Sequence, residues 1–219
     1  MTEIPADIEA AATRFHVSRE SMAGLAAYVS ALIKWQAHIN LIGPATASDV
    51  WRRHVLDGLQ LLAFMPGPET PRTVVDLGSG GGVPGLVLAI ARPGWKVHLV
   101  ESNNKKAAFL REAARLSGAK PGIHAERIEA VAQKGLGPVD YVTARALAPL
   151  PELLELAFPL LKNAHGVFHK GQDVDIELTA ATKCWIIESR KHMSLVDPKS
   201  TVLEILAVRR RDGIDSETD

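Results

Sequence analysis

The sequence contains one cysteine, Cys184, among its 219 residues, which rules out a disulfide within the chain and a cysteine-based metal cluster. This scarcity suggests a reducing compartment, so we expect a cytoplasmic protein. No uninterrupted apolar run approaches the length that spans a bilayer, and residues 1–7 lack the apolar stretch of a signal peptide. These absences exclude a membrane-embedded protein.

An excess of charge of either sign is also missing, because 25 lysines and arginines balance 25 aspartates and glutamates. A neutral total gives no general electrostatic attraction to nucleic acid, although a local basic face is compatible with it. Hydrophobic residues make up 47% of the chain, which allows a sizeable core. The length fits one α/β domain with a modest additional segment.

Glycine, by contrast, is concentrated in one stretch, where residues 74–85 read Val-Val-Asp-Leu-Gly-Ser-Gly-Gly-Gly-Val-Pro-Gly. This pattern is typical of a buried strand that ends in an acid and is followed by a glycine loop opening a helix. Glycines allow sharp turns and the close approach of a ligand to the backbone. The helix N-terminus presents unpaired N–H groups and the positive end of its dipole. Because such units hold nucleotide-like cofactors, the stretch predicts a cofactor-using enzyme.

The glycine loop alone does not select the cofactor. Residues 80–85 fit the dinucleotide fingerprint G-x-G-x-x-G, with Glu101 near the spacing of a ribose-binding acid. In a dinucleotide site, however, the strand leads directly into the first glycine of the fingerprint. Here the strand runs to Leu77 and the loop begins at Gly78, with Asp76 at the strand tip. That carboxylate would repel a pyrophosphate and attract the cationic ammonium of S-adenosylmethionine, so the charge argument favours a methyl donor.

The chain divides into three parts. We expect an N-terminal helical segment over residues 1–66 that packs on the core, a Rossmann-like methyltransferase domain over residues 67–211, and a disordered tail over residues 212–219. In the first part, helices are expected over residues 21–41 and from residue 48 or 49 to about residue 64. In the second part, strands are predicted at residues 74–77, 97–101, 123–124, 141–143 with the preceding Val139, 166–170, 185–187 and 202–208, and helices at residues 83–91, 105–116, 151–161 and 173–182.

The alternation of strands and helices predicts right-handed parallel crossovers and a doubly wound sheet. No helix is expected between the last two strands, and adjacent strands without a crossover helix usually pair antiparallel. The predicted fold class is therefore α/β, a Rossmann-like class I methyltransferase fold. It has a mostly parallel doubly wound sheet with an antiparallel last strand, preceded by an N-terminal helical segment.

Several short motifs occur in order over roughly residues 20–208. They are Trp35 with Asn40-Leu41, Arg53-His54-Val55-Leu56-Asp57-Gly58, the loop from Asp76 to Gly85, Lys105-Lys106-x-x-Phe109-Leu110, Arg127-Ile128-Glu129, Arg145-Ala146 and Lys170-Gly171. In this combination the chain resembles the RsmG (GidB) family of bacterial methyltransferases, which modify a guanine N7 in the small-subunit (16S) ribosomal RNA. Many methyltransferases share the glycine motif, whereas its combination with the R-H-x-L-D element is much more specific. The chain departs from the family at Gly58, where serine is usual, and at Gly81, where proline is frequent.

The resemblance implies S-adenosylmethionine as the cofactor, with S-adenosylhomocysteine as its product, and 16S ribosomal RNA or the small ribosomal subunit as the partner of a monomer. The cofactor-binding candidates are Asp76, Gly78, Ser79, Gly80, Val83, Glu101, Ser102, Ile128, Glu129 and Arg145. Glu101 ends the second strand, where a carboxylate can accept both ribose hydroxyls, whereas Asp76 either holds the ammonium or caps the loop. The family's matching positions imply that Ile128 and Glu129 contact the adenine.

Arg145 ends the fourth strand, at the edge where open α/β sheets bind ligands. The resemblance implies that it lies at the cofactor pocket, within reach of the cofactor or the target nucleotide, and the alternative is a structural ion pair. The RNA-binding candidates include Arg52, Arg53, Lys105 and Lys106, because cations that meet phosphates supply most nucleic-acid affinity. The resemblance adds Lys170, at the end of the fifth strand, as a further RNA contact. The alternative for such residues is a solvated face, and Asp57 offers Arg53 an ordinary i,i+4 pair.

The chemistry implied by the resemblance needs no general base, because guanine N7 carries a lone pair and no proton. Arg145 is therefore expected to act by positioning. His165 and His169 have the spacing of a helical metal pair, but Gly166 and Val167 between them indicate a strand, so no metal is expected. Three alternative functions are a small-molecule methyltransferase on the same fold, an NAD-binding oxidoreductase, and a non-catalytic RNA-binding factor in ribosome assembly.

Overall fold

The computed structural model describes residues 4–65, 67 and 69–211, so the tail expected at residues 212–219 lies outside the described residues, as do Pro66 and Pro68 of the expected linker. Seven strands form one sheet. They are β1 (Thr73–Leu77), β2 (Lys96–Val100), β3 (Gly122–His124), β4 (Tyr141–Arg145), β5 (His165–Lys170), β6 (Trp185–Met193) and β7 (Thr201–Arg210).

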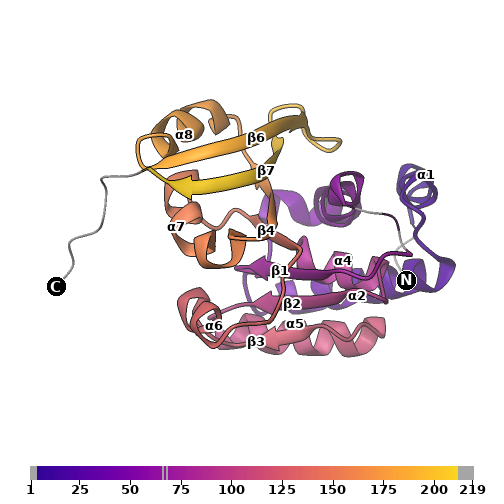
Figure 1. Cartoon of the computed structure of the whole chain (residues 1–219). Helices are drawn as coiled ribbons and strands as arrows, with labels where there is room; N and C mark the ends of the chain where they lie inside the picture. Colours follow the sequence, from indigo (N-terminus) through magenta and orange to yellow (C-terminus); the bar gives the residue numbers. More distant parts are fainter. Residues whose placement is uncertain (1–3, 66, 68, 212–219) are drawn as a thin grey trace.

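The strand order across the sheet is β3-β2-β1-β4-β5-β7-β6. Strands β1 to β5 pair parallel, and β7 pairs antiparallel with both β5 and β6. The chain runs outward from β1 to β3, then returns to add β4 on the other side of β1 (Figure 1). This topology confirms the predicted α/β class, its doubly wound sheet and its antiparallel last strand.

Helices cover both faces of the sheet (Figure 1). They are α1 (Ala6–Arg14), α2 (Arg19–Gln36), α3 (Asp57–Leu59), α4 (Gly85–Ala91), α5 (Asn104–Ser117), α6 (Ile128–Lys134), α7 (Leu150–Leu161) and α8 (Val174–Ala181), with the 3-10 segments η1 (Pro44–Asp49) and η3 (Gln60–Phe64) and the π-helical segment η2 (Trp51–Leu56). Within the described residues, no helix is both long and apolar enough to cross a membrane.

Two hydrophobic cores flank the sheet because alternate strand residues point to opposite faces. In β1, Val74 packs with α2, α4 and α5, whereas Val75 packs with α7 on the other face. In β5, Val167 and Phe168 divide between the same two cores. The sheet is therefore the middle layer of three, and its carboxyl edge is left for loops.

The helix α2 joins the N-terminal segment to the first core. Ser18 caps it by accepting a hydrogen bond from Ser21 N at 3.1 Å, and the buried side chains of Leu25, Tyr28 and Leu32 lie at helical spacing. The Tyr28 hydroxyl donates to Gly81 O at 2.7 Å, which ties this helix to the glycine loop. The N-terminal helices thus support the loop directly.

The second predicted N-terminal helix differs from the observed one. Instead of a single helix from residue 48 or 49 to about 64, the chain passes through η1, η2, α3 and η3. Two backbone acceptors in this stretch, Arg53 O and Asp57 O, receive hydrogen bonds from side chains of the sheet, Arg145 and His169. Gly58 packs so closely on α4 that a Cβ there would lie 2.8 Å from Val87. These tertiary contacts break the regular helical pattern.

Candidate functional site

The glycine loop follows β1 at the carboxyl edge of the sheet, where β1 lies between β2 and β4. The crossovers leave β1 in opposite directions at this point, which is where open α/β sheets bind ligands. Gly78 has φ +65° and Gly80 has φ +49°, and these left-handed conformations favour glycine. The Glu101 carboxylate, at the end of β2, accepts from Gly80 N at 2.9 Å and from Asn103 N at 2.7 Å. The loop and the tip of β2 therefore form one unit.

Asp76 lies beneath the loop and is completely buried. Its Oδ1 accepts from the Thr143 hydroxyl at 2.7 Å, whereas Oδ2 has no hydrogen-bond partner among the described residues. Burial raises the pKa of this carboxyl to about 6. A Cβ at Gly85 would lie 2.5 Å from Oδ2, so the first residue of α4 sits against the carboxylate. Asp76 thus lies beneath the loop with one carboxylate oxygen held by Thr143 and the other against α4.

A pocket of about 370 Å³, here called the β1–β2 pocket, opens beside the loop. Its wall includes many of the predicted cofactor residues, namely Gly78, Glu101, Ser102, Ile128 and Glu129, together with Lys106. Ile128 and Glu129 begin α6, a short helix that the sequence analysis did not identify. Ser79 and Val83 are buried in the loop, where the Ser79 hydroxyl donates to Asp76 O at 3.1 Å.

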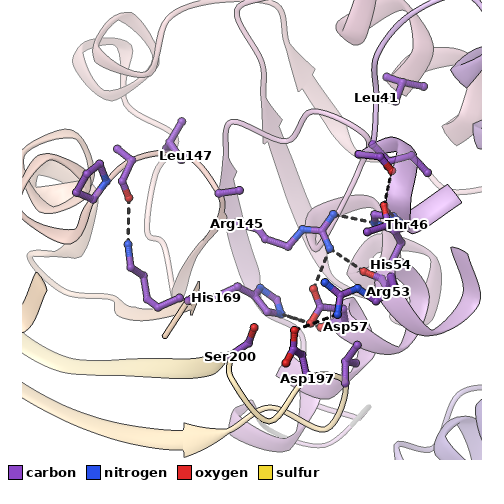
Figure 2. Close-up of a pocket in the computed structure, with 18 of the residues that line it drawn as sticks. Leu41, Thr46, Arg53, His54, Asp57, Arg145, Leu147, His169, Asp197 and Ser200 are labelled. Carbon is purple, nitrogen blue, oxygen red and sulfur yellow. Dashed lines mark hydrogen bonds and ion pairs between the residues drawn. The ribbon is translucent and has the colours of Figure 1, made fainter. Parts of the chain in front are cut away.

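A second pocket of about 630 Å³, the β4–β5 pocket, lies beyond the ends of β4 and β5 (Figure 2). It is lined by side chains from η2, β4, β5 and the β6–β7 hairpin, among them Arg53, His54, Asp57, Arg145, His169, Lys170 and Asp197. Figure 2 shows the Arg145 guanidinium pointing toward Asp57 and His54. Arg145 therefore faces this pocket.

Three acceptors hold the Arg145 guanidinium. Its Nη1 donates to Asp57 Oδ2 at 2.8 Å and to Arg53 O at 2.9 Å, and its Nη2 lies 2.8 Å from His54 Nδ1. Because a guanidinium can only donate, His54 Nδ1 accepts, and its Nε2–H faces Thr46 Oγ1 at 3.0 Å. The motif Arg53-His54-x-x-Asp57 is thus the cradle of Arg145.

The cradle has a fixed charge state near neutral pH. Burial, reinforced by Arg145, lowers the pKa of His54 to about 4, so the ring is neutral. Burial opposes ionisation of Asp57, but His169 and Arg145 outweigh it and hold the pKa of this carboxyl well below its usual range. The His169 Nε2–H donates to Asp57 O at 2.8 Å and lies 3.3 Å from Asp57 Oδ1. A buried carboxylate therefore neutralises Arg145.

The two pockets share one wall. Ala146, Leu147 and Ala148, which follow β4, line both pockets. Ala146 has φ +51°, an unfavourable conformation for a residue with a Cβ. A Cβ at Gly78 would lie 2.7 Å from Leu147 Cδ1, so Leu147 packs directly on the glycine loop. This short segment separates the pocket beside the glycine loop from the pocket beside η2, which is lined by ion pairs.

The predicted RNA-binding residues separate into different environments. Arg52 is half exposed and pairs with Asp7 at 3.2 Å, outside both pockets. Arg53 lines the β4–β5 pocket and pairs with Asp197 at 3.1 Å. Lys105 is exposed at the start of α5, and its neighbour Lys106 reaches the β1–β2 pocket. Lys170 is only 8% exposed.

Sequence reasoning missed the roles of His54, Asp57 and His169 in this site. The R-H-x-L-D motif was a signal for the first two, but no spacing rule connects them with Arg145 in β4. The sequence pattern raised only a metal-ligand role for His169. Among the described residues, no group of three or more His, Cys, Asp or Glu side chains is arranged for a metal ion.

The chain is similar to proteins of one family over most of its length. A family model described as GidB, rRNA small subunit methyltransferase G, matches residues 21–205. "Ribosomal RNA small subunit methyltransferase G" of Bradyrhizobium sp. (strain ORS 278) is 48% identical over 213 residues, which is 95% of each chain. The protein of the same name from Rhodospirillum rubrum is 49% identical over 203 residues, covering 92% of this chain and 98% of that one.

Solved structures support the fold. The crystal structure of a fibrillarin/Nop5p complex matches with a TM-score of 0.54 and 16% identity, covering 71% of this chain and 82% of the matched chain. At that identity the likeness concerns the fold alone.

Proposed function

The chain belongs to the GidB family of rRNA small subunit methyltransferases, and from this membership we propose that it methylates N7 of a guanine in 16S ribosomal RNA. It is an rRNA methyltransferase that uses S-adenosylmethionine. The finer assignment, to one atom of one base, follows from the resemblance of the motifs. We propose further that it works as a monomer in the cytoplasm.

One observation supports the proposal most strongly, namely the two pockets that share the segment 146–148. Methyl transfer requires a donor and an acceptor that approach each other in line. We assign the β1–β2 pocket to the donor and the β4–β5 pocket to the target nucleotide. The second pocket is the larger one, and although its cations are paired with carboxylates, Arg53 and Arg145 still offer N–H donors to a base and its RNA backbone.

The residues of the β1–β2 pocket fit the proposed cofactor. Its volume of about 370 Å³ lies in the range of small-molecule sites. Gly78 has a positive φ and lets Leu147 pack directly against its Cα at the wall of the pocket. Glu101 brings a carboxylate to the loop edge, where ribose hydroxyls can donate, and the wall offers no cluster of cations for a pyrophosphate. These features support S-adenosylmethionine over a dinucleotide.

When bound, S-adenosylmethionine supplies an electrophilic methyl group on a sulfonium that departs as a neutral thioether. The guanine N7 needs no deprotonation, so the chain's own contribution is to orient the base and exclude competing geometries. Three of the five N–H donors of Arg145 are taken by its cradle, which leaves two for an acceptor in the pocket. A guanine O6 is such an acceptor, and we propose that Arg145 orients the base through it.

The test is methyl incorporation into small ribosomal subunits from cells that lack this gene. Incubation with methyl-labelled S-adenosylmethionine should label the RNA of these subunits at a single guanine, whereas subunits from unmodified cells should take up no label. Mapping the labelled nucleotide and its methylated atom then tests N7. If donor binding is intact but neither the RNA nor the subunit is labelled, the proposed acceptor is wrong.

A further inference from the structure

The segment between the two pockets is held by one side chain of β5, which lines the β4–β5 pocket. Lys170 Nζ donates to Ala148 O at 3.0 Å and pairs with Glu177 Oε2 of α8 at 2.5 Å. The same carboxylate oxygen accepts from Leu150 N, the first residue of α7, at 2.6 Å. The Lys170–Glu177 pair therefore closes a clamp around residues 146–150, with one contact at Ala148 and one at Leu150.

This clamp acts on a strained segment. Ala146 has φ +51°, and such a conformation persists only when its surroundings hold it. The adjacent Leu147 packs on Gly78 at the wall of the β1–β2 pocket, while Arg145 on the other side faces the β4–β5 pocket. A shift of this segment would thus change both pockets together.

Lys170 is poorly placed to contact RNA. Its side chain is 6% exposed, and its ammonium already meets a carboxylate and a carbonyl oxygen. A phosphate contact would require breaking a buried ion pair and leaving Glu177 without its partner, which is costly. These contacts favour a role inside the protein over the RNA contact predicted from the sequence.

We propose that Lys170 is a positioning residue for methyl transfer, which acts with Glu177 to fix the segment 146–150 between the donor and the acceptor. The inference rests on the proposed function, since it assigns the two pockets to the two reactants. A displacement of about 1 Å can lower turnover by about a hundredfold, so loosening this segment should affect catalysis strongly.

The experiment compares Lys170→Met with the double variant Lys170→Met/Glu177→Met. The single variant leaves the partly buried Glu177 carboxylate without its cation, so its thermal midpoint should fall, whereas the double variant replaces the ion pair with apolar side chains and should regain much of the loss. Lys170→Met loses the contact to Ala148 O, and the double variant loses the contact to Leu150 N as well. We therefore expect turnover to stay at least tenfold below wild type in both, and the dissociation constant for S-adenosylhomocysteine to rise about tenfold.

Lys183→Met is the matched control, because Lys183 is an exposed lysine just after α8. Its turnover and donor affinity should stay within twofold of wild type, and its thermal midpoint should equal that of wild type within error. Glu177→Gln provides a milder variant, since an amide oxygen can still accept from Leu150 N. It should fold and show an intermediate loss of turnover.

Two results would overturn the inference. If the double variant regained wild-type turnover and donor affinity, the clamp would serve stability alone. If Lys170→Met raised only the KM for RNA and reduced the salt slope of RNA binding by about one, Lys170 would be a phosphate contact. S-adenosylhomocysteine affinity is measured without RNA, so the clamp remains testable even if wild type failed to methylate a guanine.

Discussion

The two pockets are built from the chain in different ways. The β1–β2 pocket takes its wall from strand ends, the loops that follow them and residues of α5, α6 and α7, all between residues 78 and 156. The β4–β5 pocket collects four separate stretches, from η1 and η2, the end of β4, the end of β5 with α8, and the β6–β7 hairpin. The first is a property of the sheet topology, whereas the second exists only because the N-terminal helices dock beside β4.

This difference has a chemical counterpart. In the β1–β2 pocket the polar group next to the loop is the Glu101 carboxylate, which two backbone N–H groups hold in place and whose remaining lone pairs suit a small cofactor. In the β4–β5 pocket a buried ion pair, Arg145 with Asp57, is held by a histidine on each side. If the β1–β2 pocket binds the donor and the β4–β5 pocket binds the target nucleotide, a substitution in one pocket should affect the reactant bound there and leave the binding of the other reactant unchanged.

The largest effect is expected from Arg145→Ala. This change removes the guanidinium from the β4–β5 pocket and leaves the Asp57 carboxylate without its main partner, so turnover should fall about a hundredfold. Donor affinity, measured by calorimetry with S-adenosylhomocysteine, should change less than twofold. Arg115→Ala is the control, since Arg115 is an exposed arginine paired with Glu112 on α5. An equal loss of donor affinity would instead assign Arg145 to the cofactor.

Gly78→Ala should give the largest effect on the donor side. The new Cβ would require φ near +65° and would lie 2.7 Å from Leu147 Cδ1. The free loop can move to relieve strain of about 2 kcal/mol, and donor binding must then restore the strained conformation. This corresponds to roughly thirtyfold weaker donor binding. Gly94→Ala serves as control, because a Cβ there meets no heavy atom within 4 Å. Unchanged donor affinity in Gly78→Ala would show that the cofactor does not use this wall.

Glu101→Ala should weaken donor binding less, by about tenfold, since it removes one charged acceptor at the loop edge. Turnover at saturating donor should remain near the wild-type value, because Glu101 lies outside the β4–β5 pocket. Titration with S-adenosylhomocysteine measures the first quantity, and a saturated methylation assay measures the second. Donor affinity equal to that of wild type would refute the ribose assignment of Glu101.

The smallest effect concerns pH and belongs to the acceptor side. Folding lowers the pKa of His54 from 6.5 to about 4. As the pH decreases through this range, His54 is therefore protonated in the unfolded chain before it is protonated in the folded chain. His54 therefore costs stability as pH falls from about 6.5 toward 4, and His98 contributes with the same sign. Asp76 has the opposite effect between pH 3.8 and about pH 6. Because its pKa rises on folding, it adds stability as the pH falls through this range.

His54→Gln should remove the His54 part of this dependence. The free energy of unfolding, measured in urea at pH 7 and pH 5, should decrease less between these two values than in wild type. His38→Gln, at an exposed histidine, should keep the wild-type difference. A wild-type difference in His54→Gln as well would mean that His54 is not buried as a neutral ring.

Much of the fold followed from local pattern. The glycine loop and the strands around it were predicted because buried parallel strands are short apolar runs bounded by glycine or proline. The strand β6 was predicted too short, ending at Ile187, because Glu188 to Met193 lie on the outermost strand and lack an apolar face. The helix α6 was missed since Val131 is its only fully buried side chain, too little for a periodic signal.

The sequence by itself determined the fold class, the cofactor loop and the family, because each depends on local patterns and on their order along the chain. The cradle of Arg145 was decided only by the tertiary structure, which brings Asp57 within 2.8 Å of a guanidinium 88 residues away. The clamp at Lys170 was decided in the same way, by the docking of α8 against the end of β5. Local patterns indicate which residues are polar or apolar, but the partner of a buried charge depends on which distant elements pack together.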